Sequence, residues 1–146
     1  MIVHFSPAAK EKMWNLVNYD DNLEIGWFGV CEKYKDMIYV KDILVYPQER
    51  YAAHFETDDR EMMQWYLSLP DDVINKIRFA GHSHVNFPAV PSGTDIADEQ
   101  RQLDVLGEND YFVWFILNRK REFSLRYYDP NTKKIFERRG LMSEPA

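Results

Sequence analysis

Apolar and polar positions alternate along the chain with two different periods, which predicts strands as well as helices. Short β-prone runs, most of them largely apolar, predict strands at Ile2–Phe5, Leu23–Val30, Met37–Tyr46, Ile77–Val85, Tyr111–Asn118 and Glu122–Tyr128. The polar stretch Lys33–Asp36 makes a hairpin of the second and third runs, and the last two runs predict another hairpin. Residues 47–56 have the composition of a loop.

Three segments show helical spacing instead. The first begins with Ser6 as N-cap and Pro7 as first helical residue, and its apolar face consists of Met13, Leu16 and Val17. The second starts at the acidic pair Asp58-Asp59 and ends before Pro70. Its spaced residues, which we expect in the core, are Met62, Trp65, Tyr66 and Leu69. The third runs over Asp95–Leu106 and ends at Gly107.

This mixture of strands and helices predicts an α+β fold with a mixed sheet. The chain contains no internal repeat, low-complexity tract or linker-like shift in composition, so we expect one domain over residues 1–146. Residues 119–146 are expected to add a hairpin and a tail.

Charge and cysteine content restrict the class of protein. The 24 acidic and 18 basic side chains give a net charge of −6, which argues against a general nucleic-acid or anionic-membrane binder. The cluster Arg119-Lys120-Arg121 is interpreted as a solvated hairpin turn. With Cys31 as the single cysteine and no signal peptide or membrane span in the sequence, a cytoplasmic protein is expected. Oligomeric state is not predicted.

The segment GHSHVNFPAVPSGTD, residues 81–95, carries the candidate chemistry. His82 and His84 stand two apart at the end of a strand, so both side chains point to the same face. A proline-containing loop then delivers Ser92 and Asp95 at the start of a helix, where the Asp95 carboxylate completes a His/His/Asp set. These nitrogen and oxygen ligands suit zinc, and three of them leave one tetrahedral position for water, as in catalytic sites.

Catalysis at such a site also needs a proton acceptor. Glu24 is the candidate, because it stands in the otherwise apolar run LEIGWFGV, where an unpaired buried carboxylate costs several kcal/mol.

Each of these residues also has a plain structural interpretation. Ser92 and Asp95 match an S-x-x-D capping box, and the two histidines fit an exposed strand face. Cys31 is expected to be an inert buried thiol rather than a nucleophile. His4 and His54 are expected to be structural or surface residues, His54 close to a substrate groove.

Glu24 followed by IGWFG, then His82-Ser83-His84, seven further residues and Ser92-Gly93-Thr94-Asp95, resembles the signature of the JAMM (JAB/MPN) zinc metalloproteases. The resemblance covers most of residues 1–118 and is strongest to compact bacterial and phage-associated members. Many family members have Pro directly after the second histidine, whereas this chain has Val85.

The resemblance implies an α/β (α+β) sandwich of the JAMM and cytidine-deaminase-like kind, a curved mixed sheet with flanking helices. It implies His82, His84 and Asp95 as ligands of one zinc ion with its bound water, Glu24 as general base and acid, and Ser92 as hydrogen-bond donor to the developing oxyanion.

The implied reaction is hydrolysis of an isopeptide or peptide bond next to a ubiquitin-like C-terminal tail, so the expected partner is a protein or peptide substrate. Two alternatives stay open, a non-catalytic scaffold or binding module of the same fold and a zinc hydrolase of non-protein amides. A groove lined by Trp27, Phe28 and Phe87 is expected to hold an extended tail by strand addition.

Overall fold

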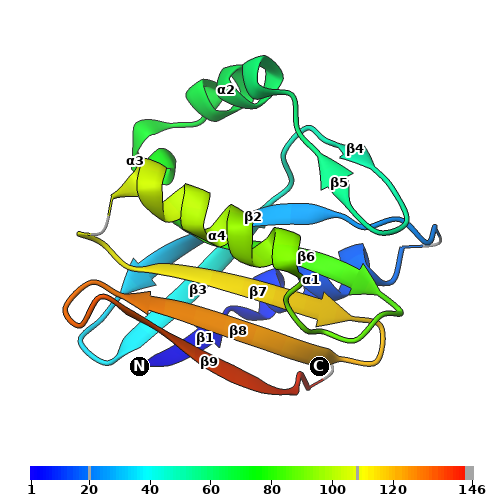
Figure 1. Cartoon of the computed structure of the whole chain (residues 1–146). Coiled ribbons are helices and arrows are strands. Elements are labelled where there is room, and N and C mark those ends of the chain that lie inside the picture. The colour runs from blue at the N-terminus through cyan, green and yellow to red at the C-terminus, as the bar shows by residue number, and fades with distance from the viewer. Residues whose placement is uncertain (20, 108, 144–146) are drawn as a thin grey trace.

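The computed structural model describes residues 1–19, 21–107 and 109–143 (Figure 1). The helices are α1 (Pro7–Val17), α2 (Asp59–Ser68), α3 (Asp71–Ile74) and α4 (Gly93–Leu106). The strands are β1 (Ile2–Phe5), β2 (Gly26–Lys33), β3 (Met37–Leu44), β4 (Glu49–Arg50), β5 (Phe55–Glu56), β6 (Ile77–Val85), β7 (Phe112–Asn118), β8 (Glu122–Asp129) and β9 (Lys134–Leu141). None of the described helices is long and apolar enough to cross a membrane.

Seven strands form one sheet in the order β1-β3-β2-β6-β7-β8-β9, while β4 and β5 form a small separate hairpin. β1 pairs with β3, and β6 with β7, in parallel, whereas the other neighbours are antiparallel. The fold is therefore of the α+β class, with a mixed parallel and antiparallel sheet and flanking helices, as the pattern of apolar positions predicts (Figure 1).

The helix α1 covers one face of this sheet and closes the main core. Ser6 is its N-cap, with Oγ accepting a hydrogen bond from the Ala9 amide at 2.9 Å, and Pro7 follows as expected. Its buried face packs on large strand residues, and the fully buried side chains include Met13, Trp27, Phe79, Phe115 and Leu117. Cys31 belongs to the same core.

On the other face, α4 packs over β7 and β8, and a smaller cluster forms there from Leu103, Phe112, Trp114 and Tyr128. α4 ends at Gly107, as predicted; its φ of 84° lies in the left-handed region that favours glycine.

The prediction that the apolar face of α2 belongs to the core is wrong. The helix begins at the predicted place, with the Asp58 carboxylate accepting from the Glu61 amide at 2.9 Å, but it contains no buried residue. Trp65 is half-buried, and its ring packs against those of Phe28 on β2 and Tyr46 just after β3. In Figure 1, α2 stands apart from the central sheet, and its inward side chains Met62, Trp65 and Tyr66 are only half-buried.

The chain after β7 contributes two more strands of the main sheet, β8 and β9, which form a hairpin. The interpretation of Arg119-Lys120-Arg121 as a solvated turn is wrong for Arg119. Its guanidinium donates to the Val17 carbonyl at 3.0 Å, the Tyr19 carbonyl at 2.8 Å and the Asn22 side chain at 2.9 Å, and also to the Asp21 carbonyl. This arginine thus fastens the loop between α1 and β2.

Candidate metal centre

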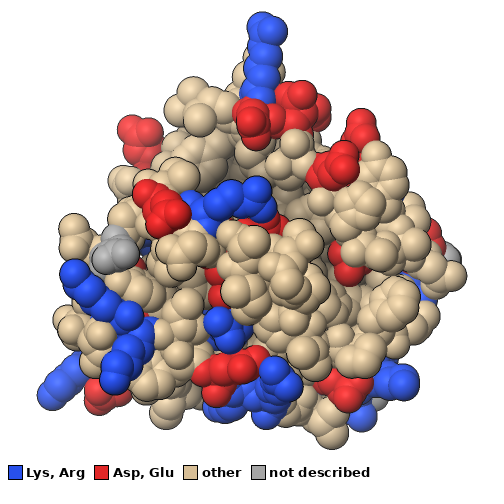
Figure 2. All heavy atoms as spheres, in the orientation of Figure 1, with Lys and Arg blue, Asp and Glu red and all other residues tan. Residues whose placement is uncertain are grey.

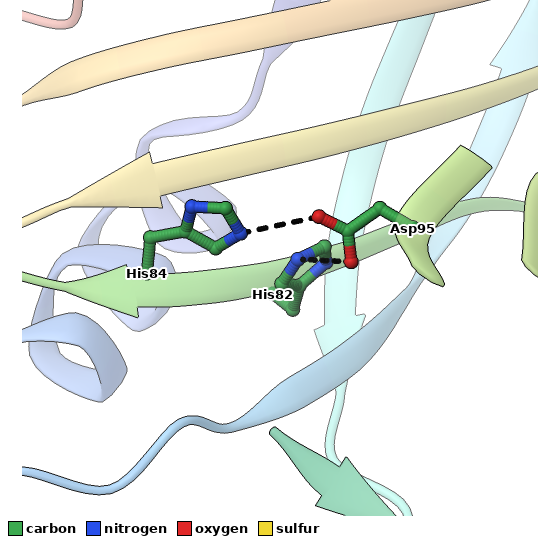
Figure 3. A group of neighbouring side chains, drawn as sticks. All are labelled: His82, His84 and Asp95. Carbon is green, nitrogen blue, oxygen red and sulfur yellow. Dashed lines mark hydrogen bonds and ion pairs between the residues drawn. The ribbon is translucent and has the colours of Figure 1, made fainter. Parts of the chain in front are cut away.

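β6 presents the two histidines of the candidate site on the same side. Strand side chains alternate, so Ala80, His82 and His84 face the α4 side, while Phe79 faces the core under α1. The two imidazole rings lie 5.0 Å apart between centroids. Figure 3 shows both rings turned toward Asp95, as the sequence spacing predicts.

The first turn of α4 supplies the carboxylate. Ser92 is the N-cap, its Oγ accepting from the Asp95 amide at 3.1 Å, and the Ser92 amide donates to Asp95 Oδ2 at 2.8 Å. The capping box expected from the sequence is therefore present. Because it fixes the Asp95 side chain, the two carboxylate oxygens lie 3.2 Å from His82 Nε2 and 3.3 Å from His84 Nε2.

The donor atoms of His82, His84 and Asp95 all lie within 4.8 Å of one another, which is close enough for one ion. The Nδ1 atom of His84 lies 2.8 Å from the Pro88 carbonyl oxygen, an acceptor that requires a proton on Nδ1. In the neutral tautomer, the Nε2 lone pair then points at Asp95. The Pro88 carbonyl fixes this tautomer in the way that second-shell carbonyls fix histidine ligands in zinc sites.

Two features of the ring nitrogens fit a cation at this place. The Nε2 atom of His82 is buried and forms no hydrogen bond, although Asp95 lies at ion-pair distance. An Nε2 lone pair of His84 facing a carboxylate oxygen is repulsive unless a proton or a metal ion lies between them. Three such donors, of borderline and hard character and without sulfur, match zinc.

The charges of the site change its pKa values in opposite directions. Burial alone would raise the pKa of Asp95, but the contacts with His82 and His84 hold that pKa well below its usual range. Burial lowers the pKa of His84, but its contacts with Asp95 and Pro88 outweigh it and raise the pKa above the ordinary value. A carboxylate that stays ionised beside two imidazoles is suited to holding a divalent cation.

Glu24 lies just before β2 and lines the same cavity as the histidines. It is 7% exposed, and burial raises its pKa, opposed by the nearby His82 and His84. No described side chain hydrogen-bonds to its carboxylate. A buried carboxylate with a raised pKa is a better proton acceptor than an ordinary surface glutamate.

A cavity of about 1020 Å³ surrounds these groups. Its walls come from the β5–α2 segment on one side and from α4 on the other, and its floor consists of β2, β6, β7 and β8. The acidic residues of these two walls include Glu56, Asp59, Asp98 and Glu99. Figure 2 shows a recess below α2 with charged side chains at its edge, and Lys and Arg side chains concentrated along the lower part of this face.

The other residues considered from sequence lie in different places. The expectation that Trp27 lines a groove is wrong, because it is fully buried under α1, whereas Phe28 and Phe87 do line the cavity. His54 lines the cavity too and lies 3.4 Å from Glu56 through Nε2. His4 is exposed on β1.

Sequence reasoning missed the residues that support Glu24. Gln48 and Arg50 lie in the segment predicted to be loop, yet both hydrogen-bond to the backbone around Glu24. It also missed the ion pair between Glu99 of α4 and Arg126 of β8, at 2.9 Å, which lines the far end of the cavity. No spacing or motif in the sequence points to either group.

Comparison with protein-family models and with curated proteins gave no match. Among solved structures, the chain is similar to the solution structure of protein DSY2949 from Desulfitobacterium hafniense, with a TM-score of 0.61 and 17% sequence identity. The match covers 94% of this chain and 90% of that one. At this identity the likeness supports the fold alone.

Proposed function

We propose that this protein is a zinc-dependent metallopeptidase of the JAMM type, which hydrolyses an isopeptide or peptide bond next to a ubiquitin-like C-terminal tail. The observation that carries the proposal is the convergence of His82, His84 and Asp95 within 4.8 Å in the same cavity that Glu24 lines. The sequence signature requires these four residues together, and they come from three separate segments of the fold.

A zinc ion bound here would polarise the amide carbonyl and lower the pKa of an attacking water molecule from about 16 to about 7. The chain's own groups handle the protons. Glu24 accepts one proton from that water and delivers it to the amide nitrogen as the carbon–nitrogen bond breaks, so the products are a carboxylic acid and an amine. Its raised pKa, caused by burial, favours both halves of this transfer.

Ser92 is the residue to which we assign oxyanion stabilisation. Its Oγ accepts the Asp95 amide proton, so the hydroxyl hydrogen is not used by the cap, and the residue lines the cavity beside the histidines. A hydroxyl can accept and donate together, so capping α4 and stabilising an oxyanion are compatible roles.

The cavity supports a polymeric substrate rather than a very small one. At about 1020 Å³ it is at the upper end of small-molecule sites, and residues of both α2 and α4 line it. Aromatic side chains of Phe28, Tyr46, Phe55 and Phe87 line it, which suits the apolar parts of an extended peptide. A cytoplasmic location is part of the proposal, supported by the single, unpaired Cys31.

The test uses the zinc-loaded full chain and a panel of linear ubiquitin-like fusions, isopeptide-linked ubiquitin-like pairs and small acyl amides. We expect cleavage of a protein amide, and a loss of about 10²–10⁴-fold in kcat for Glu24→Gln at unchanged zinc content. Undiminished cleavage by Glu24→Gln would remove Glu24 from the mechanism. Cleavage of small amides alone would indicate a non-protein substrate, and no cleavage by the zinc-loaded chain would favour a scaffold.

A further inference from the structure

The segment Leu23–Gly26, which carries Glu24, lies between a regular strand and a row of side chains. On one side it follows β6, where the Ser83 amide donates to the Ile25 carbonyl at 2.9 Å and Gly26 pairs with His82. On the other side the segment has no strand partner, because the pairing of β3 with β2 ends at Phe28 and Leu44. The backbone groups on that side therefore need other partners.

Gln48 and Arg50 supply those partners. The side-chain amide of Gln48 accepts through Oε1 from the Gly26 backbone amide at 2.8 Å and donates through Nε2 to the Gly26 carbonyl at 2.9 Å. A neighbouring strand would form the same pair of hydrogen bonds. Arg50 donates through Nε to the Glu24 carbonyl at 3.1 Å and through its Nη2 atom to the Leu23 carbonyl at 3.0 Å. The Tyr51 carbonyl accepts from the Glu24 amide at 2.8 Å.

The Arg50 guanidinium is itself held in place. Both of its terminal nitrogens lie 2.9 Å from the Asp21 carboxylate, in a bidentate pair, and the Arg50 side chain is 20% exposed. Bidentate arginine–carboxylate pairs combine strength with fixed geometry. Four hydrogen bonds from this one side chain to Asp21, Leu23 and Glu24 restrict the backbone from which the Glu24 carboxylate projects.

We propose that Arg50, held by Asp21 and assisted by Gln48, is the positioning residue for Glu24, fixing its carboxylate against His82 and His84. This inference rests on the proposed function, because it assigns Arg50 a role in the same proton transfer. Arg50 does not line the cavity and so acts through Glu24 rather than on the substrate. A displacement of about 1 Å in a reacting group is enough to lower a rate about 10²-fold.

The experiment compares Arg50→Ala and Arg50→Lys with Arg139→Ala in the zinc-loaded full chain. Arg139 is a matched control, since it also pairs with a carboxylate, Glu137 at 3.1 Å, but lies on the edge strand β9. For Arg50→Ala we expect kcat to fall tenfold or more, with KM and zinc content unchanged and the Glu24 amide exchanging its hydrogen at least tenfold faster. Arg50→Lys should be intermediate, and Arg139→Ala should match the wild type.

A double variant with Glu24→Gln separates positioning from general weakening of the fold. Arg50→Ala should cost no further activity in that background, because the group it positions is already gone. Unchanged kcat and amide exchange in Arg50→Ala, loss of zinc in that variant, or a further loss in the double variant would each overturn the proposal. If the wild type cleaves nothing, the proposed function fails, while the exchange rates of the Glu24 amide still decide whether Arg50 fixes this segment.

Discussion

The two faces of the central sheet differ in what they bury. Under α1 the sheet buries apolar side chains such as Met13, Phe79 and Phe115. Under α2 and α4 it carries a cavity whose floor and walls include His82, Glu24 and other ionisable groups. The same strands serve both faces, since neighbouring residues of β6 point alternately into the core and into the cavity.

The two faces therefore contribute differently: the face under α1 mainly stabilises the fold, and the cavity face carries the residues of the proposed chemistry. Close packing under α1 supplies hydrophobic stabilisation of the fold. On the cavity face, burial raises the pKa of Glu24 and of Glu99, and Glu99 is compensated by its ion pair with Arg126 at 2.9 Å. Buried carboxylates oppose folding unless they are paired, so the core under α1 has to offset the cost of the cavity face.

The largest effects should come from one substitution on each face. His82→Ala should abolish stoichiometric zinc binding, because three protein ligands become two. With chelator present it should lower the free energy of unfolding by only about 1–2 kcal/mol, since the polar interaction lost is the contact of His82 Nε2 with Asp95 at 3.2 Å. Metal analysis and denaturant unfolding measure the two quantities.

Met13→Ala is the opposite case. Met13 is fully buried in α1, so its truncation should lower the free energy of unfolding by about 2–5 kcal/mol while one zinc per chain is retained. The matched variant Met62→Ala, at a half-buried position on the cavity wall, should cost much less. Zinc loss in Met13→Ala at temperatures where it is folded would mean that the two faces are not separable.

Ser92 caps α4 and is also proposed to stabilise the oxyanion, so its substitution tests stability and catalysis together. Ser92→Ala removes both the cap and the hydroxyl, which should cost about 1 kcal/mol of stability. Removing an oxyanion donor should lower kcat about 10²–10³-fold. Ser92→Gly removes the hydroxyl but, as a tolerated N-cap, should cost only a few tenths of a kcal/mol.

Circular dichroism melts and initial rates on the cleaved substrate distinguish these contributions. Equal loss of kcat in the alanine and glycine variants assigns the loss to the hydroxyl. If Ser92→Gly keeps full turnover, the Ser92 hydroxyl serves only as the helix cap, through its hydrogen bond with the Asp95 amide.

The sequence predicts well that His82, His84 and Asp95 lie together, because this group of side chains is mostly local. The strand alternation that sets His82 and His84 side by side, and the capping box that places Asp95, depend on spacing within 14 consecutive residues. The strand Ile77–Val85 and the N-caps Ser6 and Asp58 follow from the same kind of short-range rule.

The supports of Glu24 could not be predicted in that way. Arg50 lies 26 positions beyond the Glu24 carbonyl that it contacts, and its loop has no periodicity. The half-buried face of α2 illustrates the same limit, because helical spacing shows which side chains share a face but not whether another element covers it. Trp27 and Phe28 are neighbours on β2 and point to opposite faces of the sheet. The sequence does not show which face α1 covers, so it does not show which of the two side chains lines the cavity.

The smallest predicted effect lies in the core under α1 and concerns its single thiol. Burial raises the pKa of Cys31 to about 12, and the residue is 2% exposed. In the unfolded chain the thiol ionises near pH 8.5. Between these values the folded state holds a proton that the unfolded state has lost, so the free energy of unfolding falls as pH rises.

Between pH 8 and pH 10 this linkage should lower the free energy of unfolding by about 1–2 kcal/mol. Cys31→Ala should remove that part of the pH dependence, whatever it does to stability at pH 8, so the comparison is between two slopes. The range stops at pH 10 because Tyr111 and Tyr127, whose pKa values burial also raises, have counterparts in the unfolded chain that ionise from there on. Identical slopes in wild type and variant would mean that water reaches the thiol, and that the core under α1 is less dry than its packing indicates.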